Sequence, residues 1–162
     1  MKKNSKKIGD EGEKFVAEYL RNKGFLTEIH PRTFRLLHLP GGKVIQISKD
    51  NDFYNLFDIK AECDGYMLYI QVKVEKSKAN TSSAQKNIDV YFPYEFPYQR
   101  IQTWMLWKEW INTDENKRKH KEYKYIIQER RGFSNSLWTY EGNKYKKGNW
   151  VLVNANDINS NF

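Results

Sequence analysis

The feature that most constrains the fold is a pair of extended runs, residues 56–74, on either side of Asp64-Gly65. Asp-Gly between two apolar runs is a strong signal for a two-residue β-hairpin, because both loop positions require positive φ. If these two residues form the loop, every cross-strand pair follows by counting outward from it. On that register Asp58 lies opposite Gln71, and opposed side chains project from the same face of the sheet.

The register divides the side chains of the hairpin between two faces. One face is an apolar core face that consists of Phe57, Ile59, Ala61, Cys63, Leu68, Ile70, Val72 and Val74. The other, more polar face consists of Asp58, Lys60, Glu62, Met67, Tyr69, Gln71 and Lys73. A slip of one residue would exchange the two faces, so the apolar pattern sets the register.

The polar face brings an acid, an amide and a lysine within contact range. A hard divalent cation prefers oxygen ligands, which Asp58, the side-chain oxygen of Gln71 and the Val72 carbonyl offer. Lys73 is placed to hold a water molecule or to stabilise developing negative charge. These groups suit metal-assisted hydrolysis of a phosphodiester. The same residue types are ordinary on the solvated face of a hairpin, so the hairpin alone leaves both interpretations open.

The N-terminal part of the chain is predicted to contain a helix, a strand and a second hairpin. Apolar residues recur at three- and four-residue steps over residues 7–23, which predicts an amphipathic helix that ends at Gly24. Residues 25–29 read as a short strand. Residues 30–52 hold a turn sequence between two strand-like runs, which predicts a hairpin. Residues 1–7 are expected to form a basic, mobile arm.

The C-terminal part is predicted to contain a helix followed by strands. Residues 76–87 read as a polar, flexible loop, and a helix is expected from Pro97 to about residue 111. It would carry Trp104, Trp107 and Trp110 as a core stripe or a dimer contact. A charged loop is expected at 114–121, and strands at 123–128, 136–140 and 150–153. The order of elements predicts one α/β domain over residues 1–162, built on a central sheet.

The composition narrows the class of protein. With 28 Lys and Arg against 20 Asp and Glu, the formal net charge is +8, which makes a polyanion the first partner to consider. Aromatic residues at 15% argue against a disordered chain. No apolar run approaches the length of a membrane span, and a single cysteine, Cys63, excludes an internal disulfide. We expect a cytoplasmic protein without membrane association.

The hairpin resembles the signature of PD-(D/E)XK nucleases, which is an acid at the end of one strand and then acid (or glutamine)-x-lysine on the next. Asp58 is followed after a short spacing by Gln71-Val72-Lys73, and Phe57-Asp58-Ile59 lies where the family often has Pro-Asp-Ile. Residues 8–16 and 23–25 are also similar to the first helix of archaeal Holliday-junction resolvases. An early glutamate of that helix completes the metal site in those enzymes, and it matches Glu13.

This resemblance, which covers residues 7–76, implies a restriction-endonuclease-like α/β core with a mixed central sheet flanked by helices. It implies an endodeoxyribonuclease that uses Mg²⁺, with Mn²⁺ as a substitute, and a homodimer if the substrate is a four-way junction. Asp58, Gln71, Val72 and Glu13 would hold the metal, and Lys73 would position the attacking water. The glutamine at position 71 departs from the glutamate usual in resolvases, and residues 30–52 look like an insertion.

Two alternatives remain open beside a structure-selective resolvase. The first is a restriction-like or homing endonuclease that cuts a defined duplex sequence. The second is a nucleic-acid-binding protein without catalysis, which the loss of a charge at Gln71 favours. In each case DNA, branched or duplex, is the expected partner. The lysines expected to contact its phosphates are Lys3, Lys6, Lys7, Lys76 and Lys78.

Overall fold

The computed structural model describes residues 5–29, 33–38, 40–42, 44–49, 53–54, 56–112 and 119–158. In chain order the elements are α1 (Ser5–Asn22), β1 (Leu26–Ile29), β2 (Thr33–His38), β3 (Val44–Lys49), β4 (Ile59–Cys63), β5 (Tyr66–Val74), α2 (Ser82–Tyr91), β6 (Gln99–Asn112), β7 (Lys119–Tyr140), β8 (Asn143–Val153) and the 3₁₀ turn Ala155–Asp157.

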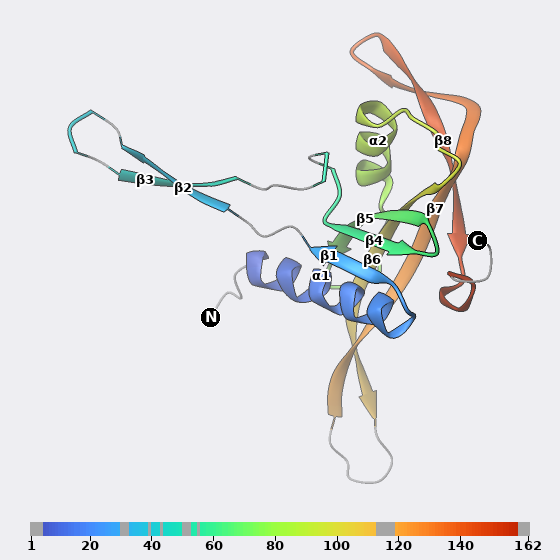
Figure 1. The fold of residues 1–162 in the computed structure, drawn as a ribbon, viewed down its shortest axis with the longest axis horizontal. Helices are drawn as coiled ribbons and strands as arrows, with labels where there is room; N and C mark the ends of the chain where they lie inside the picture. Colours follow the sequence, from blue (N-terminus) through green and yellow to red (C-terminus); the bar gives the residue numbers. More distant parts are fainter. Residues whose placement is uncertain are drawn as a thin grey trace.

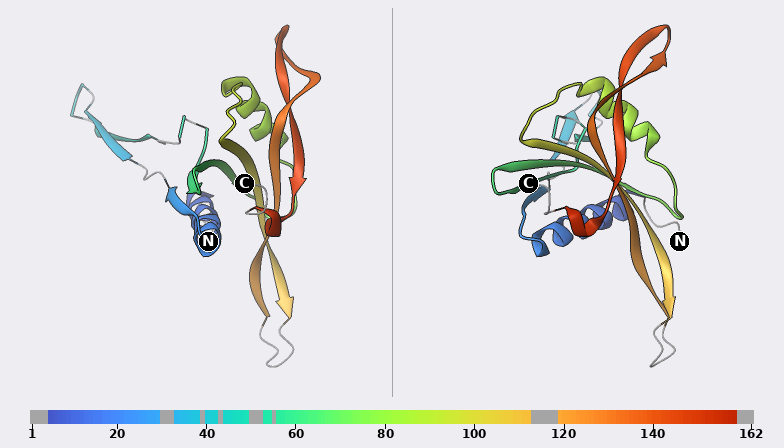
Figure 2. Two further views of the ribbon diagram at one scale, coloured as in Figure 1. Left: turned by 45° about the vertical axis from the view of Figure 1, so that its right-hand side comes forward. Right: turned by 90° about the vertical axis from the view of Figure 1, so that its right-hand side faces the viewer.

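The centre of the fold is a six-stranded mixed sheet in the order β1-β4-β5-β6-β7-β8. All neighbouring strands run antiparallel except β5 and β6, which are parallel and are connected through α2. Helix α1 and helix α2 lie on opposite sides of this sheet (Figures 1 and 2). The prediction of an α/β fold with a mixed central sheet flanked by helices is therefore confirmed at this level.

The larger of two cores lies between α1 and the sheet. The helix contributes apolar residues at the predicted spacing, and the strands contribute the facing side chains; the set includes Val16, Ala17, Leu20, Ile59, Ile70 and Trp104. Gly12 allows the close approach, because a Cβ at this position would overlap the side chain of Val74. Gly24, with φ +93°, ends the helical turn as expected.

The predicted hairpin is formed by β4 and β5 with the expected register. Cys63 pairs with Tyr66 and Ile59 pairs with Ile70. The loop residues Asp64 and Gly65 have φ values of +50° and +80°, the positive values that the turn requires. Local turn chemistry and the alternation of apolar residues were thus sufficient to define this element.

The interpretation of the polar face as an ordinary solvated face is wrong at Tyr69. This residue is buried in a second core, between α2 and the sheet, with Ile88, Phe92 and Ile101. Phe57 was assigned to the opposite face, but it precedes β4 and packs on the ring of Tyr69 with a centroid distance of 5.4 Å. The polar residues of this face therefore lie beside a packed aromatic cluster.

The predicted helix over residues 97–111 is wrong, because this segment is strand β6. Residues 101–107 are all buried, since helices cover both faces of the strand, and such a strand shows no alternation of polar and apolar residues. Trp104 is fully buried against α1 on one face, Trp107 points to the other, and Trp110 is 63% exposed where β6 pairs only with β7. The three tryptophans do not form a helical stripe.

The predicted flexible loop at 76–87 is wrong in its second half, where α2 begins at Ser82. The strands predicted at 123–128 and 136–140 are parts of one 22-residue strand, β7, which also includes residues 119–121 of the predicted charged loop. The remainder of that loop lies outside the described residues. Strand β7 extends past both ends of the sheet, with β6 at its start and with β8 at its end (Figure 1).

The second predicted hairpin is present. Strands β2 and β3 pair with each other and form a separate two-stranded sheet between β1 and β4 in the sequence. The N-terminal arm was predicted too long, because α1 starts at Ser5 and includes Lys6 and Lys7. Lys3 lies outside the described residues. No helix among the described residues is long and apolar enough to span a membrane.

Candidate active site

The predicted acid and amide are in direct contact. Oδ2 of Asp58 accepts a hydrogen bond of 2.8 Å from Nε2 of Gln71 and one of 2.7 Å from the backbone N–H of Val72. Both side chains are half-buried at the point where β4 begins. The structure therefore brings together three of the groups that the hairpin register placed on one site.

The end of the strand pairing explains this contact. The last pair of the β4–β5 ladder is Ile59 with Ile70, so Val72 extends beyond the first residue of β4. Asp58 still donates its own N–H to the carbonyl of Ile70, at 2.9 Å, which holds its side chain over the extension of β5. No residue of β4 pairs with Val72, and the Asp58 carboxylate accepts the hydrogen bond from the Val72 N–H instead.

The same geometry directs the Val72 carbonyl to the site. The N–H and the C=O of a strand residue point to the same side of the strand, since paired residues exchange both bonds. Because the N–H of Val72 points to Asp58, its carbonyl faces the same side, beyond the β4–β5 ladder. The Val72 peptide group thus faces the Asp58 carboxylate across the edge of β5. The Gln71 side chain reaches the same carboxylate through its own hydrogen bond.

Lys73 lies next along β5, with its ammonium 3.4 Å from the Glu75 carboxylate. Both side chains are more than one-third exposed, so this ion pair is weak and can rearrange. Lys76 and Lys78 are exposed in the connection that follows, on the way to α2. The predicted lysines of this region are therefore all accessible to a solvent-borne anion.

Glu13 belongs to α1, which packs on the face of the sheet opposite the side chains of Gln71 and Lys73. Its neighbour Gly12 lies against Val74 and Val72 of β5, and Glu13 itself is half-buried. Lys6 and Lys7 are one to two turns earlier on the same helix. The helix prediction placed Glu13 correctly on α1, whereas Lys6 and Lys7, which were expected in the mobile arm, belong to the first turn of the helix.

A buried polar network beside the site was not predicted. Nε2 of Gln85 in α2 donates to Oε1 of Gln128 at 2.7 Å and to Oγ1 of Thr81 at 2.9 Å, and Thr103 donates to Thr81 at 3.2 Å. Thr103 is the register partner of Gln71. The network fixes the first turn of α2 over the sheet beside Gln71. No local sequence signal identifies it, because its members are distant in the sequence.

Tyr69, a member of the second core, precedes Gln71 by two residues on β5. Burial raises the pKa of its phenol, and its hydroxyl lies 3.5 Å from that of Tyr54. Tyr69 therefore remains a neutral hydrogen-bonding group at physiological pH and contributes no charge next to Asp58.

The oxygen atoms at the site are those that a hard divalent cation prefers: a carboxylate, an amide carbonyl and a peptide carbonyl. Gln71 turns its NH₂ group to Asp58, and a half-turn about its last side-chain bond would present Oε1 instead. The donor set fits a magnesium ion in this respect. Among the described residues no group of three or more His, Cys, Asp or Glu side chains is close enough to hold a metal.

Comparison with known proteins provides no relative on which to base a function. No family model, no curated protein and no solved structure matches the chain. The assignment of function therefore depends on the geometry of the site itself.

Proposed function

We propose that this chain is a divalent-metal-dependent DNA endonuclease that hydrolyses phosphodiester bonds. The observation that carries the proposal is the hydrogen-bonded contact of Asp58 with Gln71 and the Val72 amide, with Lys73 next along the same strand. This arrangement has an acid directly before one strand and glutamine-x-lysine on its antiparallel neighbour, which keeps the order of residues that the PD-(D/E)XK resemblance implies.

Each residue of the site has a role in this proposal. Mg²⁺, or Mn²⁺ in its place, would polarise the phosphate and generate the nucleophile from a bound water. Asp58 would be its charged ligand, with the Gln71 amide oxygen and the Val72 carbonyl as neutral ligands. Glu13 would contribute from α1. Lys73, released from Glu75, would hold the attacking water and balance the charge that develops on the phosphate.

The charge of the chain supports DNA as the substrate. The formal net charge is +8, and Lys76 and Lys78 are exposed directly after the site. Phosphate contacts from such lysines would supply sequence-independent, salt-dependent affinity. The subtype that we favour is a structure-selective, junction-resolving enzyme, which would act as a homodimer because two opposed cuts require two sites.

One observation favours a second candidate, a nucleic-acid-binding protein without catalysis. The amide of Gln71 uses an N–H donor to bind Asp58, so the pair is satisfied without a cation. A glutamate at this position would repel Asp58 and would need a metal between them. Gln71 is therefore compatible with a site that keeps its fold and its DNA affinity without cleaving.

Cleavage of labelled DNA with Mg²⁺, with Mn²⁺ and with EDTA distinguishes these candidates. The panel holds a four-way junction, a duplex, a flap and a single strand. Symmetric, metal-dependent nicks in the junction alone support the resolvase, and cutting of duplex at fixed positions supports a restriction-like or homing enzyme. Binding without cleavage in either metal contradicts the nuclease proposal and supports the second candidate.

Paired variants connect any cleavage to this site. Asp58→Asn should abolish metal-dependent cleavage and keep DNA binding, whereas Glu62→Gln, an exposed acid on the same hairpin, should cleave normally. Lys73→Met should slow cleavage by about 100- to 1,000-fold, the usual effect of removing one stabilising group. Lys60→Met is its matched control on β4. Normal cleavage by Asp58→Asn would show that the active site lies elsewhere.

A further inference from the structure

The last residue of α2 and the connection to β6, residues 91–98, carry an unusual number of exposed aromatic rings, and we name this stretch the aromatic segment. Tyr91 is 71%, Tyr94 55%, Phe96 49% and Tyr98 65% exposed. The segment contains the tripeptide Phe-Pro-Tyr twice, at residues 92–94 and 96–98. Single exposed aromatic residues are ordinary, but a contiguous group of this size marks an interaction surface.

The segment is held in place by a buried charge. The Arg130 guanidinium donates to the carbonyls of Phe92, at 2.9 Å, and Tyr94, at 2.7 Å. Its own charge is paired with Asp89 of α2 at 3.3 Å, and the side chains of both are almost completely buried. The backbone that carries the exposed rings is therefore fixed before a ligand binds. Binding does not include the entropic cost of ordering this segment.

Two of these rings lie next to each other. The centroids of Tyr94 and Phe96 are 6.2 Å apart with a tilt of 38° between their planes. Tilted rings at this separation are in contact with each other. A base would therefore stack on the exposed face of one of these rings and not between them.

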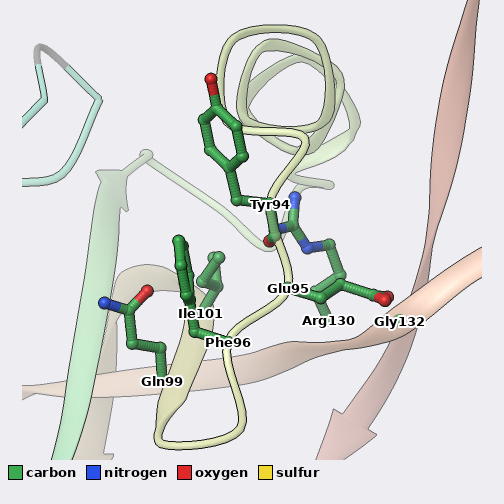
Figure 3. A pocket seen from close by; sticks show the side chains of 7 residues that line it. All are labelled: Tyr94, Glu95, Phe96, Gln99, Ile101, Arg130 and Gly132. Carbon is green, nitrogen blue, oxygen red and sulfur yellow. The ribbon is translucent and has the colours of Figure 1, made fainter.

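A polar cavity adjoins these rings. It has a volume of about 140 Å³ and lies between the aromatic segment and β7, with Gln99 at one end and Arg130 at the other (Figure 3). One water takes up about 30 Å³ in the liquid, so the cavity admits a larger group. The Oε1 atom of Gln99 is buried and has no hydrogen-bond partner among the described residues. An N–H at the edge of a base would satisfy this acceptor once the Gln99 amide turns toward the cavity.

Cationic side chains also stand on α2 and on the paired ends of β7 and β8, which run together past α2 (Figure 2). Lys147 lies 4.8 Å from the ring of Trp138, and Lys86 of α2 lies 4.9 Å from the ring of Tyr140. Trp138 donates to Asp89 of α2 over 3.0 Å, so Lys147 lies beside the helix that carries Lys86 and that leads into the aromatic segment. Positive charge beside exposed aromatic rings is the combination that single-stranded nucleic acid recognises.

We propose that the aromatic segment is a docking surface for the unpaired bases of single-stranded DNA. Bases within a duplex have no free face, so only an unpaired stretch can stack on Tyr94 and Phe96. Ile101, which lines the cavity, pairs with Tyr69, about 7 Å along β5 before Gln71. If the chain is a nuclease, as proposed above, this surface would select substrates that contain unpaired bases; that part of the inference rests on the nuclease proposal.

Fluorescence anisotropy in EDTA tests this surface without any cleavage. The protein is the full chain with Asp58→Asn, and the probes are a single strand, a matched duplex and a strand of equal length that lacks bases. We expect the normal single strand to bind at least tenfold more tightly than the strand without bases, which carries the same phosphates. Tyr94→Leu and Phe96→Leu should each remove about five- to tenfold of this preference. Trp110→Leu, an equally exposed ring on another part of the sheet, should not.

Two outcomes overturn the proposal. Equal binding of the strands with and without bases would show that the affinity is electrostatic only. Unchanged binding by both leucine variants, whose thermal unfolding should match that of the parent, would place any stacking elsewhere. These results are independent of the nuclease proposal: cleavage with no base preference refutes only the docking surface, and base-dependent binding without cleavage refutes only the nuclease.

Discussion

Replacement of Gln71 by glutamate tests both the contact with Asp58 and its relation to a cation. The wild-type amide donates to the carboxylate over 2.8 Å. A hydrogen bond to a charged group contributes about 1.5–3 kcal/mol, and the variant replaces it by two carboxylates in contact, which cannot both ionise at low cost. For this half-buried pair we expect Gln71→Glu to lower the free energy of unfolding by about 2–4 kcal/mol at pH 7.5 in EDTA.

The pH dependence of this loss has a defined sign. The pair in the folded variant retains one proton, so its pKa lies above the value of about 4.3 for glutamate in the unfolded chain. The loss is therefore complete above the folded pKa and diminishes as the pH falls toward 4.3, because the protonated carboxyl introduced at position 71 again donates to Asp58. Urea unfolding at pH 7.5 and pH 5, followed by tryptophan fluorescence, measures the difference.

Addition of Mg²⁺ should reverse the loss. A cation bound only by the folded protein stabilises it by about 1.4 kcal/mol at ten times its Kd, and two carboxylates bind it more tightly than one. Mg²⁺ should thus raise the unfolding midpoint of Gln71→Glu more than that of the wild type. Asn149→Asp, which adds the same charge at an exposed position of β8, is the control. A variant as stable as wild type in EDTA, or no response to Mg²⁺ by either protein, would refute this reasoning.

Three further predictions concern the stability of the fold. Arg130→Met should lower the free energy of unfolding by about 3–5 kcal/mol in urea titrations, because it leaves the buried Asp89 carboxylate without its counter-charge; equal stability would refute the pairing. Gly12→Ala should cost about 1–3 kcal/mol in the same assay through overlap with Val74, and no loss would mean that α1 packs less closely. Burial raises the pKa of the Tyr19 phenol to about 12. The free energy of unfolding should therefore fall as the pH rises from 10 to 12, because the unfolded chain loses this proton first. Urea titrations across that range should show a smaller fall for Tyr19→Phe.

Much of the fold near the site could be predicted because it depends on neighbours in the sequence. Asp64 and Gly65 define the turn, and the alternation around them defines the register from Cys63–Tyr66 to Ile59–Ile70. Asp58 follows the last of these pairs and reaches Gln71 through its side chain. The contact of the carboxylate with the Val72 amide could not be read from the pattern. It depends on where β4 begins, which is after Phe57, a residue that packs into the second core.

The sequence by itself determined helix α1, both hairpins and the pairing of the acid with the amide, since each follows from turn residues or from apolar periodicity over short distances. Only the tertiary structure decided that residues 99–112 form a strand and residues 82–91 a helix. Strand β6 is covered on both faces, so its sequence shows no alternation of polar and apolar residues. Helix α2 buries Asp89, which is satisfied by Arg130 and Trp150, residues 41 and 61 positions away. Partners so distant in the sequence leave no local signal. The polar sequence of α2 therefore predicts a loop, and only the contacts with the sheet show that it is a helix.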